Sequence, residues 1–263
     1  MKVNYSKKYT SDLKDKIKKL QSNLEAEKRK NEKLLSLIVS TMHEVRLFSS
    51  VLSNEAYNLQ KIDLPSEEQV KGSAETIFYT SGMLFARLGY TDLEINPAVT
   101  QKQAKVSSGF YKKFDKARYL LLKKANEKNI RINFLGTSHM EFDAIPAFDL
   151  VPFVLLQNAV KYTPSGYSVD ISFEERNNSY LEVRIRNYGP HVSDEEIPFL
   201  FEKGKRGNSV SNVEGEGEGL YLAKRICDFH FIKLRVELGD RLRHQINGVN
   251  YRLFTIIMDF ERL

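Results

Sequence analysis

A heptad pattern without a helix breaker runs through the first part of the chain. Neither Gly nor Pro occurs between Met1 and Asp63. Positions spaced alternately by four and three residues are apolar in ten cases out of fourteen, and they are Leu13, Ile17, Leu20, Leu24, Glu27, Asn31, Leu34, Ile38, Thr41, Val45, Phe48, Leu52, Glu55 and Leu59. This spacing predicts one continuous helix that packs against another helix. The polar residues Glu27 and Asn31 at heptad core positions either weaken helix pairing there, or help to fix the register and the number of paired helices.

A second helix is predicted after Pro65, which ends the first. Ser66 followed three residues later by Gln69 is the pattern of a capping box. Apolar residues then recur until about Tyr90. Two such helices form a hairpin, and because one hairpin buries little apolar surface, two copies in a four-helix bundle are the expected completion. A coiled coil that serves only as a spacer is the alternative.

Composition excludes several classes of protein. The single cysteine, Cys227, excludes an intrachain disulfide and a cysteine-rich metal site. The net charge is +6, but the lysines gather in 2–33 and 102–131 among acidic residues with few aromatics. Solvated helix faces explain them better than a nucleic-acid partner does. The apolar run 34–39 is far shorter than the roughly 20 residues of a membrane span, and no signal peptide is visible. We therefore expect a cytoplasmic protein without a transmembrane segment in this chain.

The second half of the chain changes to mixed helices and strands. Helices are predicted over 110–127, 148–162 and 219–229, and strands over 130–135, 167–173, 180–187, 233–238 and 251–260. Helices on one face of a mixed sheet make an α+β sandwich. The expected fold class is therefore an N-terminal coiled coil and helical hairpin, forming a dimeric four-helix bundle, followed by an α/β sandwich domain.

Two segments of this domain carry polar residues in suggestive places. In 155–164, Leu-Leu-Gln-Asn-Ala-Val-Lys-Tyr-Thr-Pro, residues Asn158, Lys161 and Tyr162 fall on one helix face. Taken alone, Asn158 would be better explained as an ordinary polar residue inside a helix. In 187–190, Asn-Tyr-Gly-Pro, a glycine follows the end of a strand, which is also typical of an ordinary turn.

Two further segments are rich in glycine, aromatic and basic residues. The stretch 197–207, Ile-Pro-Phe-Leu-Phe-Glu-Lys-Gly-Lys-Arg-Gly, ends in a basic pair that either reaches a phosphate or is simply solvated; its phenylalanines are expected to pack in the core. The stretch 215–220, Gly-Glu-Gly-Glu-Gly-Leu, opens a helix. Glycines let backbone N–H groups approach phosphates at a helix N-terminus, although a flexible linker has the same composition. A Rossmann site is excluded because no strand leads directly into these glycines.

In their order and spacing, the four segments resemble the N, G1, F and G2 boxes of the GHKL ATPases, histidine kinases in particular, over about 149–230. The resemblance implies that the domain binds ATP, that Asn158 offers its carboxamide oxygen to Mg²⁺, and that 206–213 belong to a mobile lid. It implies nucleotide-binding roles for Asn158, Lys161, Tyr162, Asn187, Gly189, Arg206, Gly215, Gly217, Gly219 and Leu220.

His43 occupies the outermost position of the heptad, so it is not a core histidine. Alone it would be a surface histidine without a role. Its context, Met-His-Glu-Val-Arg over 42–46, resembles the H-box of histidine kinases. The resemblance implies that His43 accepts a phosphoryl group and that Glu44 acts as general base. Other GHKL ATPases lack such an upstream hairpin.

The resemblance implies three domains: a coiled-coil signalling helix (1–40), a dimerisation and phosphoacceptor hairpin (41–95) and an ATP-binding catalytic domain (105–263). It implies a homodimeric histidine autokinase that passes phosphate to an aspartate of a response-regulator-like partner. One alternative is a degenerate pseudokinase that serves as a dimeric scaffold. Another is a GHKL kinase that phosphorylates Ser or Thr, as anti-sigma-factor kinases do.

The sequence departs from the family in three places. Asn187 replaces the Asp that accepts a hydrogen bond from adenine, which predicts about tenfold weaker ATP binding and relaxed exclusion of guanine. Val154 replaces another Asn of the N-box. Leu47 and Phe48 replace the Thr or Asn and the Pro that follow the H-box Arg. Because leucine cannot position a water molecule, we expect little phosphatase activity, and without the proline we expect a straighter helix.

Overall fold

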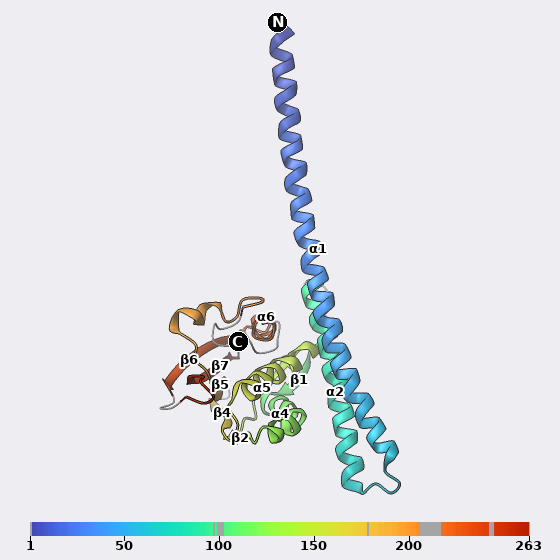
Figure 1. Ribbon diagram of the computed structural model, residues 1–263, viewed down its shortest axis with the longest axis vertical. Coiled ribbons are helices and arrows are strands. Elements are labelled where there is room, and N and C mark those ends of the chain that lie inside the picture. Colours follow the sequence, from blue (N-terminus) through green and yellow to red (C-terminus); the bar gives the residue numbers. More distant parts are fainter. Residues whose placement is uncertain are drawn as a thin grey trace. The chain divides into compact units, whose positions relative to one another are not determined.

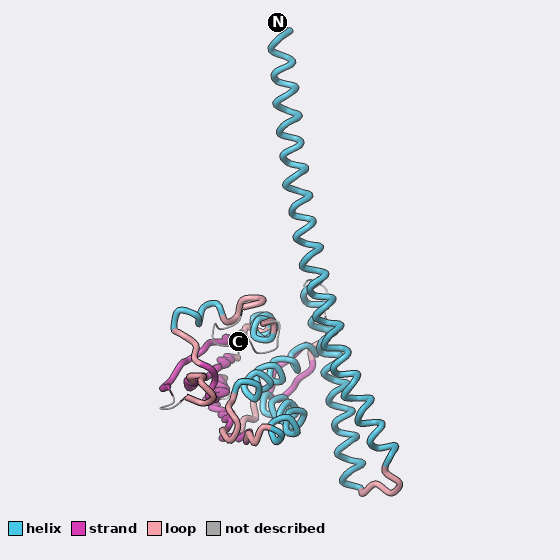
Figure 2. Tube along the Cα trace, viewed as in Figure 1, coloured by secondary structure: helices cyan, strands magenta, loops and turns pink. Residues whose placement is uncertain are grey.

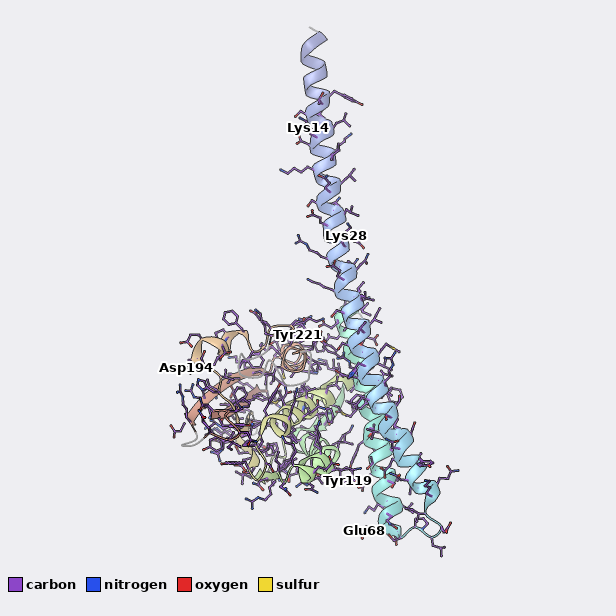
Figure 3. The ribbon with its side chains drawn as sticks, in the orientation of Figure 1. Lys14, Lys28, Glu68, Tyr119, Asp194 and Tyr221 are labelled. Carbon is purple, nitrogen blue, oxygen red and sulfur yellow. The ribbon has the colours of Figure 1, made fainter. Side chains whose placement is uncertain are left out.

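Helix α1, Lys2–Lys61, is one continuous helix of 60 residues (Figure 1). The absence of Gly and Pro and the heptad pattern predicted this, and the helix continues unbroken through Leu47 and Phe48. Its first heptad residues, Leu13 to Leu24, are between 40% and 67% exposed. Lysines of this part of α1, such as Lys14 and Lys28, project into solvent (Figure 3). An exposed apolar stripe agrees with the predicted packing against another helix, which stays a prediction.

The computed structural model describes residues 2–96, 98, 103–177, 179–205, 217–241 and 245–262, and side chains from residue 9 onward. It divides into two compact units, Met1–Leu47 and Phe48–Leu263. Among the described residues, α1 is long and apolar enough to cross a membrane by length and composition alone, with a mean hydropathy of 1.2 over 18 residues. Core helices of other proteins pass the same test. The expected absence of a transmembrane segment stays a prediction.

Helix α2, Glu67–Ile95, begins with the predicted capping box. Gln69 N donates to Ser66 Oγ at 3.2 Å, and Ser66 N donates to Gln69 Oε1 at 2.9 Å. The prediction that this helix fades near Tyr90 is wrong, because it runs on to Ile95. Leu93 is buried on the added turn, and the helix ends where Asn96 precedes a proline in the sequence, a position that disfavours helical backbone.

The second half forms the expected mixed sheet. Its five strands, in spatial order, are β2 (Arg131–Leu135), β4 (Ser168–Arg176), β5 (Tyr180–Pro190), β7 (Tyr251–Glu261) and β6 (Lys233–Arg241). β2 pairs with β4 in parallel, and the other neighbours are antiparallel. The sequence did not predict a second, two-stranded sheet of β1 (Val106–Gly109) and β3 (Glu141–Ala144), whose strands have only four residues each.

Helices α4 (Phe110–Glu127), α5 (Leu150–Tyr162) and α6 (Gly219–Phe229) cover one face of this sheet (Figures 1 and 2). The α+β sandwich is thus confirmed. The helix expected from residue 148 starts instead with a 3-10 turn, η1 (Pro146–Asp149), and a second 3-10 turn, η2 (Asp194–Phe199), follows β5. Between sheet and helices lie fully buried side chains, among them Phe110, Phe114, Phe148, Leu155, Leu156, Ile171, Leu181 and Ile185.

Candidate functional site

The candidate site begins where helices α5 and α6 meet. Gly219, the first residue of α6, lies so close to α5 that a Cβ atom on it would stand 2.9 Å from Val154 Cγ1 and 3.4 Å from Asn158 Nδ2. Val154 and Asn158 are four residues apart and share one face of α5. A side chain at Gly219 would push into this face. The glycine therefore lets the first turn of α6 reach Asn158, and two of the four sequence segments come together.

The first turn of α6 is suited to bind an anion. Gly217 has a φ of +71°, in the left-handed region that glycine tolerates. Glu218, the N-cap residue, makes no side-chain cap hydrogen bond. The N–H groups of the first turn, including that of Leu220, therefore remain suited to phosphate oxygens. The Glu218 carboxylate instead lies 3.3 Å from Lys203 Nζ, which offsets a charge that would repel phosphate.

Asn187 lies near the end of β5 on the face that the helices cover. Val183 and Ile185, each 1% exposed, alternate along that face, and Asn187 continues the alternation at 5% exposed. Its Nδ2 donates to the backbone oxygen of Tyr188 at 3.1 Å. The amide oxygen is then the atom with which this side chain would accept a hydrogen bond from a base. Gly189 follows, and a Cβ there would lie 3.8 Å from Asn187 Nδ2.

The last turn of α5 carries Lys161 and Tyr162, both half-buried. The Lys161 ammonium group lies 4.9 Å from the centroid of the Tyr162 ring, close enough for a cation–π contact. Thr163, with extended backbone, is the C-cap residue of the helix, and its backbone N–H and its hydroxyl both donate to the Ala159 oxygen, at 3.0 and 2.6 Å. Asn158, Lys161 and Tyr162, at positions i, i+3 and i+4, share one face at the end of this helix.

Two of the predicted nucleotide-binding residues, Arg206 and Gly215, lie outside the described residues. Lys205, the other half of the basic pair, is exposed, with its Nζ 6.0 Å from the centroid of the Phe199 ring. Phe199 is itself 51% exposed, so the expected core packing is wrong for this residue. The 3-10 turn η2 directs Leu200, at 8% exposed, into the core in its place.

His43 is exposed on α1, and the adjacent Glu44 is half-buried. Exposure agrees with the outermost heptad position. It leaves the imidazole accessible to an incoming phosphoryl group, which a phosphoacceptor requires.

Sequence reasoning missed the lysines that hold the start of α5. Lys113 and Lys116 of α4 both contact Asp149, the residue before α5, and Lys116 Nζ lies 2.6 Å from its Oδ2. Burial raises the pKa of Asp149, but the two ammonium groups outweigh burial and hold this pKa below its usual range. The available signal was the spacing of the two lysines, which places both on one face of α4.

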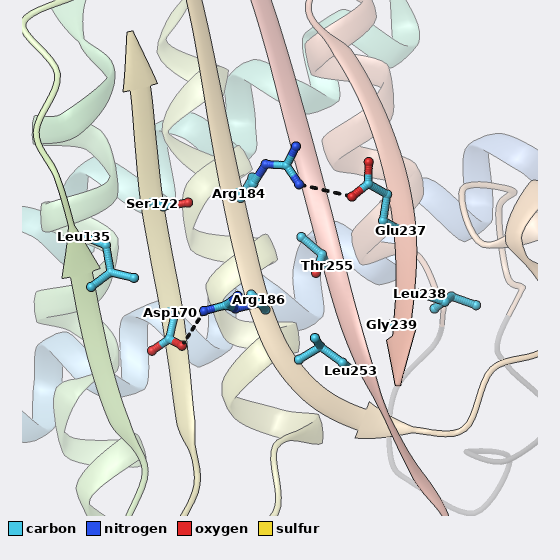
Figure 4. Close-up of a pocket in the computed structure, with 10 residues that line it drawn as sticks. All are labelled: Leu135, Asp170, Ser172, Arg184, Arg186, Glu237, Leu238, Gly239, Leu253 and Thr255. Carbon is cyan, nitrogen blue, oxygen red and sulfur yellow. Dashed lines mark hydrogen bonds and ion pairs between the residues drawn. The ribbon is translucent and has the colours of Figure 1, made fainter. Parts of the chain in front are cut away.

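The opposite face of the sheet carries paired charges (Figure 4). A depression of about 470 Å³ there is lined by Leu135, Asp170, Ser172, Arg184, Arg186, Glu237, Leu238, Gly239, Leu253 and Thr255. Arg184 lies 3.1 Å from Glu237, and Arg186 lies 3.5 Å from Asp170. None of the lining residues belongs to the four segments, and their charges cancel. This face is therefore separate from the candidate nucleotide site.

A family model matches the segment of the chain that carries the candidate site. Residues 148–259 match the family model described as "Histidine kinase-, DNA gyrase B-, and HSP90-like ATPase". The matched segment runs from η1 to β7 and contains Asn158, Asn187 and Gly219.

Individual relatives are similar over shorter stretches. The sensor protein kinase PmrB of Pseudomonas aeruginosa is 40% identical over 77 residues, 29% of this chain and 16% of that protein. The adaptive-response sensory kinase SasA of a Synechococcus species (strain JA-3-3Ab) is 34% identical over 103 residues, 39% of this chain and 26% of that protein. These alignments thus span about a quarter or less of the relatives' length.

A solved structure shares the fold. Full-length ShkA in complex with AMPPNP is 15% identical, with a TM-score of 0.50, covering 87% of this chain and 46% of that one. The chain therefore contains an ATP-binding domain of the family of histidine kinase-, DNA gyrase B- and HSP90-like ATPases, and the resemblance to histidine kinases that the motifs predicted is confirmed.

Proposed function

We propose that the chain is an ATP-dependent histidine autokinase of a two-component phosphorelay, which phosphorylates His43 and passes the phosphoryl group to an aspartate of a response regulator. The observation that supports the proposal best is the approach of Gly219 to Asn158, which would form the phosphate end of a nucleotide site. The similarity to sensor kinases supports the kinase half. The domain limits 1–40, 41–95 and 105–263 belong to the same proposal.

The proposed reaction is a displacement at the γ-phosphorus of ATP. A nitrogen of the His43 imidazole forms the P–N bond while the P–O bond to the leaving ADP breaks, and Glu44 takes up the imidazole proton. Most of the acceleration comes from positioning and charge neutralisation, because the chemistry leaves little else for the protein to do. Lys161 and the N–H groups of the first turn of α6 supply that neutralisation, and Tyr162 borders the nucleotide.

Magnesium would enter this site together with the nucleotide. Among the described residues, no group of three or more His, Cys, Asp or Glu side chains is placed to hold a metal ion. Mg²⁺ usually takes one or two protein oxygens and completes its shell with phosphate oxygens and water. The carboxamide oxygen of Asn158, beside the start of α6, fits this need. When bound, the ion neutralises charge on the β- and γ-phosphates.

The proposed homodimer is supported by an apolar stripe on α2. Its members are 43% to 72% exposed and recur at helical spacing: Val70, Phe78, Phe85, Leu88 and Ile95. Exposed apolar rows of this kind mark interaction sites. A second hairpin covering the stripe would complete a four-helix bundle. We place this homodimer in the cytoplasm.

Phosphatase activity towards the partner is expected to be weak or absent. Leu47, 47% exposed, stands where the family positions a water molecule with Thr or Asn, and its side chain has no hydrogen-bonding group. We expect a phosphorylated response regulator to lose its phosphate at the same rate with and without this chain. Rapid dephosphorylation that depends on the chain would contradict this expectation.

A pseudokinase is the second candidate. Two observations favour it: an apolar Val154 side chain faces Gly219 where the family has an amide, and Asn187 offers adenine an uncharged acceptor. Such a protein would dimerise and bind partners through its helices without transferring phosphate.

The test is incubation with Mg²⁺ and γ-labelled ATP, beside a His43→Gln variant. The proposal expects label that is acid-labile, alkali-stable and absent from the variant. Label that persists in the variant would point to another acceptor, such as the Ser or Thr of a partner-directed kinase. No label at millimolar ATP would refute the kinase proposal and leave the pseudokinase.

A further inference from the structure

Lys128 joins the end of helix α4 to the end of helix α5. Its Nζ donates to three backbone oxygens, those of Val160 at 2.7 Å, Lys161 at 2.8 Å and Thr163 at 2.9 Å. An ammonium group has three N–H donors, and here each can meet a carbonyl. The last carbonyls of a helix lack partners within the helix. Lys128 therefore supplies hydrogen-bond donors to the carbonyl groups at the end of α5.

The local backbone holds Lys128 in place. Lys128 is the C-cap residue of α4, and Asn129 after it has a φ of +54°, in the left-handed region. Ile130 N donates to Ala125 O at 2.8 Å, and Asn129 N donates to Asn126 O at 2.9 Å. These two bonds are those of a Schellman motif, and its apolar residues Ala125 and Ile130 are both buried, at 1% and 2% exposed. The chain thus turns sharply, and the lysine is left aimed at α5.

The turn that Lys128 holds is the one that carries Lys161 and Tyr162. Both residues belong to the last turn of α5, where a helix without a cap frays. The ammonium group also offsets the partial negative charge of the helix end, which would repel a nucleotide. Burial lowers the pKa of Lys128, and Lys124 lowers it further, which agrees with an ammonium group bound by carbonyls rather than by water.

We propose that Lys128 is a positioning residue of the nucleotide site: it fixes the last turn of α5, so that Lys161 and Tyr162 are ordered before the nucleotide arrives. The proposal rests on the proposed nucleotide-binding role of that turn. Lys128 does not itself touch the nucleotide.

The first experiment compares Lys128→Met with Lys123→Met, a matched control that removes an exposed lysine from the same helix. Hydrogen exchange is measured over 158–165 without nucleotide. Faster exchange in Lys128→Met alone is expected, and unchanged exchange would overturn the proposal. This readout needs no ligand. It therefore still decides the role of Lys128 if the wild-type protein binds no ATP, an outcome that would defeat only the proposed function.

The second experiment titrates ATP with Mg²⁺ into the same variants by calorimetry. We expect Lys128→Met to raise the Kd about tenfold and Lys123→Met to change it by less than about twofold. In a Lys161→Met background the effect of Lys128→Met should largely disappear, because the two act as a unit. Equal effects in both backgrounds would indicate a general loss of stability and overturn the positioning role.

Lys128→Arg covers the case in which the methionine variant does not fold. Arginine keeps the charge, but its planar fork matches three converging carbonyls poorly. A folded Lys128→Arg protein with a Kd about threefold weaker than wild type is expected. A wild-type Kd together with wild-type exchange would overturn the proposal.

Discussion

The helical N-terminal region and the ATP-binding domain differ in how much apolar surface they cover by themselves. In helix α1, Leu20 is 67% exposed and Leu24 is 57% exposed, although both belong to the heptad stripe. In the ATP-binding domain, Leu155 and Leu156 of α5 are completely buried. The domain thus has a core of its own, whereas helix α1 carries an apolar stripe that is exposed in the single chain. The difference teaches that the domain can be stable through its own core, whereas on our proposal the stability of the helices depends on dimerisation.

The largest expected effect comes from the association of the helices. Phe78→Glu with Phe85→Glu places charges on the exposed stripe of α2. Four buried phenylalanines per dimer contribute about 6 kcal/mol or more to dimerisation, so we expect a monomer at micromolar concentration. Sedimentation measures this, and nucleotide binding by the domain serves as the control that should not change. A dimer that survives would show that another surface joins the two copies.

A substitution in the core should destabilise the ATP-binding domain itself. Leu155→Ala leaves a cavity in the ATP-binding domain and should lower its free energy of unfolding by about 2–5 kcal/mol. Leu20→Ala removes the same atoms from an exposed site and should change the unfolding of this domain by less than about 0.5 kcal/mol. Urea titration of both variants, followed by tyrosine fluorescence, checks this. Equal losses would break the distinction between the two regions.

Acid should destabilise the ATP-binding domain through its buried histidine, His230. His230 is 8% exposed beside the rings of Phe148 and Phe229. Burial lowers its pKa from 6.5 to about 4, and Lys105 and Lys113 add to this. Between pH 6.5 and pH 4, His230 binds a proton in the unfolded chain but not in the folded domain. Its contribution to the stability of the folded domain is therefore complete above pH 6.5 and falls as the pH drops towards 4. The loss is about 3 kcal/mol.

The check is urea unfolding of the domain at pH 7 and pH 4.5. His230→Phe should show less loss between these pH values than wild type, by about 2–3 kcal/mol. His43→Gln, which alters an exposed histidine on α1, should lose as much as wild type. If wild type and His230→Phe respond equally to acid, His230 is not the group responsible.

Sequence reasoning succeeded where a local pattern decides the structure. The heptad spacing gave the single helix α1, and Ser66 with Gln69 gave the start of α2. The bounds of α4 and α6 also agree with those predicted. The end of α2 was missed because Leu93 becomes buried through packing that no local pattern shows.

The candidate site was predictable as a set of residues but not as an arrangement. Spacing placed Asn158 and Lys161 on one helix face, yet the contact between Gly219 and Val154 joins segments that are 65 positions apart in the sequence. Lys128 went unnoticed for the same reason: its partners lie on another helix, 32 to 35 residues away. Side chains that satisfy distant backbone groups leave no periodic signal.

The smallest expected effect tests the departure at Asn187, within the domain that is stable on its own. Asn187→Asp would replace a neutral acceptor for the adenine amino group with a charged one, so we expect ATP to bind up to about tenfold more tightly. The same change removes the donor that bonds the Tyr188 oxygen at 3.1 Å and buries a carboxylate. The nucleotide-free domain should therefore lose about 1–3 kcal/mol of stability.

Calorimetric titration with ATP and unfolding without nucleotide measure the two halves of this prediction. Asn187→Ala separates the effect on ATP binding from the effect on stability, because it also loses the hydrogen bond to Tyr188 but offers the adenine base no acceptor. We expect it to weaken ATP binding while Asn187→Asp strengthens it. If neither variant changes the Kd for ATP, the adenine base does not lie against β5. That outcome would favour the pseudokinase, in which the helices that we propose to dimerise carry the function.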